Sequence, residues 1–426
     1  MGGRVAVNTT SASPARIQRV RVCSYAARFQ SGTAQVFGVG DPSFTLCVRD
    51  RSQLDFVLKG DTYSVAVAFI RGQFDICGDF IEAIRHLTSV PRRGVGSMIS
   101  RLASWCGPWR LGSLFQSRTR AARNIRFHYD RSNAFYRQFL DSRMVYSCAY
   151  FKDAEWNIEQ AQEAKLDYIC RKLDLQCGDR FLDVGCGWGG LVIHAAARYG
   201  VQATGCTLST RQADFASSRG AGMGLQGRAS IVDKDFRDLG GSYDKIASIG
   251  MFEHVGRQRL LSYFKGMYAL LSPQGLFLNH GITRPQLEGE GPESRFVRRR
   301  VFPGGELAHL SDVVRQAERA GFELLDVENM RPHYSLTCKA WARRLEQNAE
   351  ACLCEVGSET YRTWLLYLSA CSISFEEGHL DVYQVLLAKR GNARSRRLSR
   401  EYMYGQRHIA GLHSDGPPGP SPMLSK

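Results

Sequence analysis

One glycine-rich turn, LDVGCGWGG at residues 182–190, limits the folds open to this chain more than any other stretch. The apolar residues RFLDV that lead into it indicate a buried strand, and GLVIHAAARYG, which follows, has the pattern of a helix ending on Gly200. Glycines at such a junction let the backbone approach a ligand at the positive N-terminus of the helix. The stretch therefore predicts the first βα unit of a ligand-binding α/β sheet.

The downstream chain continues this alternation of strands and helices. KLDYICRKL has helical periodicity, and the apolar runs QATGCTLS, SIV, KIASIGMF and GLFLNHGI are typical of strands separated by helices. FELLDVENM and VYQVLLAKRG indicate a final pair of strands. Alternation of this kind predicts the α/β class, with a mostly parallel, doubly wound, Rossmann-like sheet between two layers of helices.

A smaller α+β domain is expected upstream. QVFGV, SFTLCV and SVAVAFIRGQFDI indicate strands between Gly and Asp turns, and FIEAIRHL indicates a short amphipathic helix. The basic segments PRRGVGS and QSRTRAARN indicate a linker after it. We expect four parts: a basic flexible arm over 1–34, the small N-terminal domain over 35–118, the α/β domain over 119–395, and a basic, then Pro/Gly-rich flexible tail over 396–426.

The chain is strongly basic, with 56 Lys and Arg against 41 Asp and Glu and a formal net charge of +15. This excess predicts a polyanionic partner, either nucleic acid or an anionic lipid surface, although plain solubility is the simpler alternative. Nucleic acid is disfavoured because the chain carries no recognition motif for it. No stretch approaches the ~20 apolar residues of a membrane span, and TWLLYLSACSISF at residues 363–375 suits a buried or amphipathic helix. A membrane contact would therefore be peripheral.

The 13 cysteines have neither the spacing of a disulfide framework nor that of a zinc site. We therefore expect reduced thiols, no bound metal and a cytoplasmic location.

The glycine turn argues against a dinucleotide. Gly185, Gly187 and Gly190 satisfy the GxGxxG pattern, but a dinucleotide site needs an acid about 20 residues further on to hold the ribose hydroxyls. That position falls in GCTLS at residues 205–209, which contains no acid. The strand-final LDVGCGWG instead resembles class I S-adenosylmethionine-dependent methyltransferases.

Eight stretches, in order along the chain, resemble the cyclopropane fatty acid synthase family, which includes the mycolic acid cyclopropane synthases. They are HYDRSNAFYRQFLDSRMVYSCAYF, LDVGCGWGG, GCTLSTRQ, SIGMFEHVG, LNHGI, VFPGG, HYSLTCKAW and VYQVLLAKRG. The resemblance covers roughly residues 40–395. It implies an enzyme that transfers the methyl group of S-adenosylmethionine to the cis double bond of an unsaturated phospholipid acyl chain in an anionic membrane. Bicarbonate would assist proton loss and closure of the cyclopropane ring.

The resemblance also implies the residues that hold the bicarbonate. Cys148 and Ile282 would bind it through their backbones, and Glu253, His280 and Tyr334 through their side chains. The last three types suit this role, because His and Tyr donate hydrogen bonds to an oxyanion and Glu accepts one or orients the histidine. The alternatives are a satisfied strand-end histidine, an acid at a helix N-terminus and a loop tyrosine that only packs.

Cys371 matches a cysteine that the family has been assigned as an active residue. An alkene needs no covalent step, and the residues around Cys371 indicate an apolar helix, so we prefer a buried structural thiol. By the same chemistry the sulfur of Cys148 is incidental, and a small residue there lets the backbone face an anion.

The residues that the resemblance implies for the cofactor surround the glycine turn. Thr207 and Gln212 would replace the missing ribose acid, and Phe236 stands where mycolate enzymes carry a tryptophan beside the adenine. The full set is Tyr146, Ser147, Asp183, Gly185, Gly187, Gly189, Thr207, Gln212 and Phe236.

Two groups of arginines suggest how such an enzyme would meet a lipid surface. One group is Arg298–Arg300, and the other is Arg394, Arg396, Arg397 and Arg400. Contact with lipid phosphates and a solvated basic face are both open for them. The small domain would contact lipid or a second copy in a homodimer.

Three other functions fit parts of the sequence. The same scaffold could add a methyl branch to an acyl chain without closing a ring, or methylate a small amine. A lipid-binding module without catalysis is the alternative from another class, although an intact glycine turn and intact base ligands argue against it.

Overall fold

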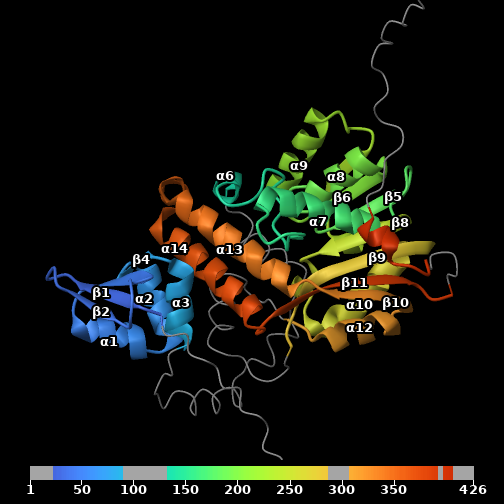
Figure 1. The fold of residues 1–426 in the computed structure, drawn as a ribbon. Helices are drawn as coiled ribbons and strands as arrows, with labels where there is room; N and C mark the ends of the chain where they lie inside the picture. The colour runs from blue at the N-terminus through green and yellow to red at the C-terminus, as the bar shows by residue number, and fades with distance from the viewer. Residues whose placement is uncertain (1–22, 90–131, 286–306, 392–396, 406–426) are drawn as a thin grey trace, which may run out of the picture.

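The computed structural model describes residues 23–89, 132–285, 307–391 and 397–405. A small sheet with its helices lies at one end of the molecule, a large α/β unit lies at the other, and two long helices lie between them (Figure 1).

The large sheet has seven strands in the order β10-β11-β9-β8-β5-β6-β7. The strands from β5 to β9 pair in parallel, whereas β11 is antiparallel to both β9 and β10. Their bounds are β5 Arg180–Val184, β6 Gln202–Thr207, β7 Ala229–Asp233, β8 Tyr243–Ile249, β9 Leu271–Thr283, β10 Phe322–Asn329 and β11 Asp381–Lys389. The predicted mostly parallel sheet and its final strand pair are confirmed.

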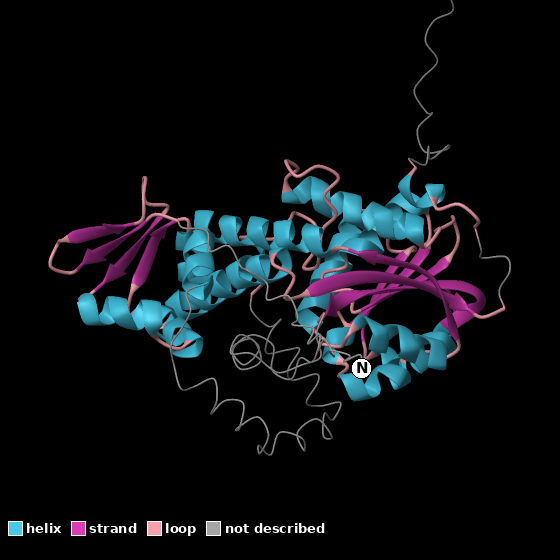
Figure 2. Ribbon diagram, turned by 60° about the horizontal axis from the view of Figure 1, so that its bottom comes forward, coloured by secondary structure: helices cyan, strands magenta, loops and turns pink. Residues whose placement is uncertain are grey.

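Helices cover both faces of this sheet, as Figure 2 shows. One buried cluster joins the strands to α7 and α8, and another joins them to α10 and α12. The bounds are α7 Ile158–Lys172, α8 Gly190–Tyr199, α9 Thr210–Gly222, α10 Leu260–Leu270 and α12 Leu310–Arg319. The fold is the doubly wound sheet of class I methyltransferases, as expected.

The strand order reverses direction at β5. From β5 the chain builds outward through β6 and β7, then returns to add β8 and β9 on the other side. Connections leave β5 and β8 in opposite directions, which opens a crevice beyond their carboxyl ends where α/β sheets bind ligands.

The small sheet begins earlier in the sequence than we predicted. Its order is β2-β1-β3-β4, with β1 at Tyr25–Phe29, β2 at Ala34–Phe37, β3 at Phe44–Val48 and β4 at Asp75–Gly78. Strand β1 lies inside this sheet and buries Tyr25 and Ala27. The predicted arm over residues 1–34 is therefore too long, because YAARF pairs on both sides with strands that follow it. Residues 1–22 lie outside the described residues, as does the predicted boundary at 118.

The segment SVAVAFI was predicted as a strand, and this prediction is wrong. It belongs to α2 (Thr62–Ile70), which follows α1 (Arg51–Lys59) and precedes α3 (Phe80–Ser89). The Asp61 side chain accepts a hydrogen bond from the backbone N–H of Ser64 and so caps α2. Burial of Val65, Ala68 and Phe69 on one face stabilises the helix against the strand preference of its β-branched residues.

The two units are joined by α13 (Arg331–Gln347) and α14 (Ala349–Glu376). Arg362 of α14 donates to the carbonyl oxygens of Phe69 and Phe74 in the small domain, at 3.2 and 3.3 Å. Arg85 of α3 pairs in turn with Glu376 at 2.8 Å. The segment TWLLYLSACSISF lies in α14, as predicted for a buried helix.

Part of the predicted flexible tail is folded. Residues Glu401–Tyr404 form the short helix α15, and Met403 is buried. Arg397 pairs with Asp174 at 2.7 Å and Arg400 with Asp326 at 3.0 Å, so acidic partners hold this segment on the α/β unit. These two arginines are therefore engaged within the protein, whereas the other predicted lipid-contacting arginines lie outside the described residues. Among the described segments, no helix combines the length and apolar character needed to cross a membrane.

Candidate active site

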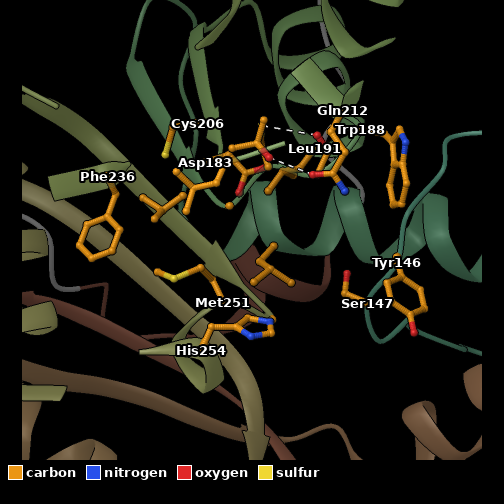
Figure 3. Close-up of a pocket in the computed structure, with 18 of the residues that line it drawn as sticks. Tyr146, Ser147, Asp183, Trp188, Leu191, Cys206, Gln212, Phe236, Met251 and His254 are labelled. Carbon is orange, nitrogen blue, oxygen red and sulfur yellow. Dashed lines mark hydrogen bonds between the residues drawn. The ribbon is translucent and has the colours of Figure 1, made fainter. Parts of the chain in front are cut away.

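A cavity of about 350 Å³ opens at the carboxyl ends of β5, β6 and β8, where the strand order reverses. All the predicted cofactor residues except Gly189 line it. Figure 3 shows Tyr146 and Ser147 at one end and Phe236 at the other, with Asp183 and Gln212 between them. The volume lies at the lower end of the usual range for small-molecule sites.

The glycine turn gives the cavity its wall. Gly185 and Gly187 have φ values of +80° and +52°, which other residues adopt at a cost. A Cβ at Gly185 would also lie 3.0 Å from the side chain of Met251. Gly189 differs, because a Cβ there would lie 2.8 Å from the Cβ of Ala216 on α9. Gly189 thus permits the packing of α8 on α9 and does not line the cavity.

Thr207 and Gln212 form a hydrogen-bonded pair beyond the end of β6. The Thr207 hydroxyl donates to Oε1 of Gln212 at 2.9 Å, and both side chains are buried. The pair stands where a dinucleotide enzyme would place its ribose-binding acid.

Aromatic rings close the two ends of the cavity. Phe236, in the short 3₁₀ turn Phe236–Asp238, meets Tyr263 edge-on at a centroid distance of 5.8 Å. Tyr146 packs at 5.0 Å against Trp341 of α13. α13 also holds the backbone after Tyr146, since Thr337 accepts from the N–H of Ala149 at 3.0 Å and His333 from that of Phe151 at 3.1 Å.

A buried lysine that sequence reasoning missed also lines the cavity. Lys165 of α7 is 1% exposed, and its ammonium donates to the Ser147 hydroxyl at 2.9 Å. Burial lowers the pKa of Lys165 to about 8, although Asp141, Cys148 and Asp183 oppose this. Burial raises the pKa of Asp183 to about 7 against the attraction of Lys165. The available signal was the position of Lys165 at the start of the predicted helix KLDYICRKL, on the side of its apolar residues.

Glu253 is held beside this cavity by the end of β9. It lies in the 3₁₀ turn Phe252–His254 after β8, and its Oε1 accepts from the backbone N–H of Ile282 at 2.7 Å. Burial raises the pKa of Glu253 to about 7, although that hydrogen bond opposes the shift. Its other oxygen, Oε2, is buried and has no hydrogen-bond partner among the described residues. The Ile282 N–H, predicted to bind bicarbonate, is thus engaged by Glu253.

His280 lies on β9 with its ring buried and neutral. Burial holds the pKa of His280 well below its ordinary value, and the charges of Lys165 and Lys172 lower it further. Its Nδ1 lies 3.4 Å from Nε2 of Gln384 on β11. Its Nε2 is buried without a partner in the part of the chain that the structure describes.

Tyr334 lies in the first turn of α13. The alternative expectation, that Tyr334 is a loop residue, is therefore wrong. Its ring stacks on Phe375 at 4.6 Å. Burial holds the pKa of the Tyr334 hydroxyl well above its ordinary value, and Cys148, Cys371 and Glu253 add to this effect. The pKa of Tyr334 thus responds to three other residues of the predicted site.

Neither predicted cysteine is poised as a nucleophile. The Cys148 thiol donates to the carbonyl oxygens of Ala149 at 3.3 Å and Met330 at 3.7 Å. Burial raises the pKa of Cys148 far above that of a free thiol and raises the pKa of Cys371 to about 12. Both sulfurs are therefore protonated near neutral pH.

A family model described as mycolic acid cyclopropane synthetase matches residues 116–385, which include the whole of the cavity and its surroundings. The chain belongs to this family. A "probable fatty acid methyltransferase" from Pseudomonas putida is 37% identical over 354 residues, covering 82% of this chain and 88% of that protein. The cyclopropane-fatty-acyl-phospholipid synthase of Escherichia coli is 35% identical over 274 residues, covering 64% of this chain and 70% of its own length.

Solved structures agree with this membership. The mycolic acid cyclopropane synthase CmaA1, in complex with SAH and CTAB, superposes with a TM-score of 0.60 at 34% identity. The match covers 63% of this chain and 98% of that one. The protein is therefore an S-adenosylmethionine-dependent methyltransferase of the cyclopropane synthase family.

Proposed function

We propose that the enzyme transfers the methyl group of S-adenosylmethionine to a cis double bond in a phospholipid acyl chain and closes a cyclopropane ring, with bicarbonate as the proton acceptor. The observation that carries this proposal is a pair of buried polar atoms, Glu253 Oε2 and His280 Nε2, that have no hydrogen-bond partner within the described residues. A buried polar atom without a partner costs free energy, and native proteins keep such atoms chiefly where a ligand completes them.

The residues of the cavity fit S-adenosylmethionine. Positive φ angles at Gly185 and Gly187 let the backbone approach the ligand, the Thr207–Gln212 pair suits the ribose hydroxyls, and Phe236 offers a ring face to the adenine. Lys165 orients the Ser147 hydroxyl beside them. When bound, the cofactor supplies the electrophilic methyl group.

The groups around Glu253 and Tyr334 fit a small oxyanion with one acidic proton. Tyr334 keeps its hydroxyl proton, neutral His280 has one N–H, and Glu253 lies near its midpoint at neutral pH and can accept a hydrogen bond. Bicarbonate presents both acceptor oxygens and a hydroxyl, and when bound it supplies the base.

An alkene is a poor nucleophile, so the protein must position it, exclude water and stabilise a developing cation. Aromatic faces perform the last task through their quadrupoles. Tyr146, which lines the cavity, packs against Trp341, and Tyr334 stacks on Phe375. These aromatic side chains support an acyl chain as the second substrate.

The names of the relatives support a lipid in this position, and one of them names an acyl phospholipid. The net charge of +15 favours an anionic membrane surface over free fatty acid in solution. We propose a cytoplasmic enzyme that meets this surface peripherally, with a homodimer as a further prediction.

The experiment that tests the function expresses the chain in cells whose phospholipids are monounsaturated and follows their acyl chains by mass spectrometry and proton NMR. The expected result is a gain of one methylene per chain, with loss of olefinic protons and appearance of upfield ring protons. A gain without ring protons would establish methyl branching instead. No gain, from protein shown to be folded and to bind S-adenosylmethionine, would favour a lipid-binding module or a small-amine substrate.

A further inference from the structure

Gln384 is a polar side chain in the most apolar strand of the large sheet. Strand β11 reads DVYQVLLAK, and Val382, Val385 and Leu386 around Gln384 are buried. Gln384 itself is 0% exposed, and its Oε1 has no partner among the described residues. An apolar side chain would occupy this position at lower cost, because a buried amide loses its hydrogen bonds to water. The glutamine therefore needs a reason other than packing.

The reason lies on the neighbouring strand β9, directly opposite Gln384. Gln384 pairs with His280 in the register between β11 and β9, and the side chains of directly paired residues stand side by side on one face. The Gln384 amide nitrogen lies 3.4 Å from Nδ1 of His280. The other ring nitrogen of His280, Nε2, has no hydrogen-bond partner in the described part of the chain.

A neutral imidazole carries one proton, and the partner of one nitrogen decides where the proton sits. His280 is held neutral by burial and by the nearby positive charges of Lys165 and Lys172. An amide N–H that donates to Nδ1 makes Nδ1 the acceptor, so the ring proton must lie on Nε2. The buried Nε2 is then a hydrogen-bond donor.

We propose that Gln384 is a positioning residue that fixes His280 in its Nε2-protonated tautomer, so that the ring presents a donor to an anion in the base site. This inference rests on the proposed function for the identity of that anion. The tautomer itself is a property of the protein alone. With the opposite tautomer, Nε2 would present a lone pair to a negatively charged ligand and repel it.

The test measures the tautomer by long-range proton–nitrogen correlation NMR on the full chain with ¹⁵N-labelled histidine. The chain has 10 histidines, and the His280 signals are assigned by their loss in His280→Asn. The expected pattern is a protonated Nε2 and an unprotonated Nδ1. A protonated Nδ1 in the wild-type protein would overturn the proposal.

Two substitutions at Gln384 separate tautomer control from packing. Gln384→Glu places a carboxylate beside Nδ1, which should move the proton there or make the ring cationic. Gln384→Met keeps the length of the side chain but removes the amide, so the His280 ring should populate a mixture of its two tautomers. We expect about 10- to 100-fold lower turnover in both variants, with S-adenosylmethionine affinity within about twofold of wild type. An unchanged His280 pattern in Gln384→Glu would contradict the proposal.

Asn279→Leu is the matched control. The Asn279 amide is as buried as that of Gln384 and lies one residue from His280, on the opposite face of β9. There its oxygen accepts a hydrogen bond from the Tyr263 hydroxyl at 2.8 Å. The substitution should lower stability but leave the His280 tautomer unchanged. If wild-type protein makes no cyclopropane while Gln384→Glu still inverts the tautomer, the proposed function fails and this inference stands.

Discussion

Lys165 connects the two halves of the candidate active site at the scale of single residues. Its ammonium donates to Ser147 on the cofactor cavity, and its charge acts on Asp183, Cys148 and His280. One buried cation thus favours the ionised form of Asp183 and the neutral form of His280. A positive charge favours the charged form of a nearby acid but the neutral form of a nearby base, and here both forms suit the proposed chemistry.

Glu253→Gln should lower turnover at least 100-fold, because the amide oxygen is taken by the Ile282 N–H and the amide NH2, which replaces Oε2, donates and cannot accept from the bicarbonate hydroxyl. Binding of S-adenosylmethionine should stay near the wild-type value, since Glu253 does not line the cavity. Turnover is measured by acyl-chain mass gain and binding by calorimetry. A variant with near-normal turnover would contradict the role of Glu253.

The same substitution should change how stability depends on pH. The pKa of Glu253 is raised from 4.5 to about 7 in the folded protein. The folded state therefore binds the proton more tightly than the unfolded state, and the stabilisation present below pH 4.5 is lost as pH rises through 7. Relative to wild type, Glu253→Gln should become more stable by up to about 3 kcal/mol between pH 4.5 and 8. Urea unfolding at both pH values measures this, and a constant difference would refute the buried-carboxyl interpretation.

Cys148→Ser should keep much of the wild-type turnover. The thiol is protonated and turned toward the carbonyl oxygens of Ala149 and Met330, and a hydroxyl can donate to the same acceptors. Steady-state assay of the purified variant is sufficient. Complete loss of turnover in a folded variant would restore a nucleophilic role for the sulfur.

At the scale of elements, the cavity depends on how closely α8 and α9 approach behind the glycine turn. Gly189 is the N-cap residue of α8 with φ +75°, and Ala216 faces it from α9. Two small residues at one contact let the helices pack without a gap, so the glycine turn lies above a rigid support. Gly189, which is not one of the three glycines of the GxGxxG pattern, therefore has a packing role that differs from that of Gly185 and Gly187.

Gly189→Ala should destabilise the protein by about 1–3 kcal/mol, because the new Cβ meets Ala216 and the φ angle is unfavourable. Ala216→Gly in the same chain removes the first cause but not the second, so the double variant should recover part of the loss. Chemical denaturation of both variants and of Ala216→Gly alone tests the coupling. Purely additive effects would show that the two residues do not meet.

At the scale of the whole molecule, α13 and α14 serve both units. α13 carries Tyr334 and Trp341, and Arg362 and the Arg85–Glu376 pair attach the small domain to α14. The aromatic side of the site therefore lies on the same helices that carry the small domain.

The charge of the whole chain predicts how it meets its substrate. With a net charge of +15, the protein should co-sediment with vesicles that contain anionic phospholipid and far less with purely zwitterionic ones. Salt should weaken this binding, since the Debye length falls from about 10 Å at 0.1 M to about 3 Å at 1 M. Equal binding to both vesicle types, unaffected by salt, would argue against the proposed surface contact.

The sequence by itself determined the doubly wound sheet and its glycine turn. These features follow from spacings of two to a few residues, which encode strand and helix periodicity and the φ angles of a turn. The family resemblance placed Thr207 and Gln212, which lie at the end of a recognisable strand and just after it. The family resemblance added Glu253 and His280 in the same way, through local motifs.

Only the tertiary structure decided which polar groups are buried, and beside what. YAARF became an inner strand, SVAVAFI became a helix and residues 401–404 folded back as a helix, because partners distant in the sequence bury them. The contact of Gln384 with His280 and that of Lys165 with Ser147 arise from the pairing of strands and the packing of a helix. Local patterns do not record such contacts, since burial and its pKa shifts depend on segments far apart in the chain.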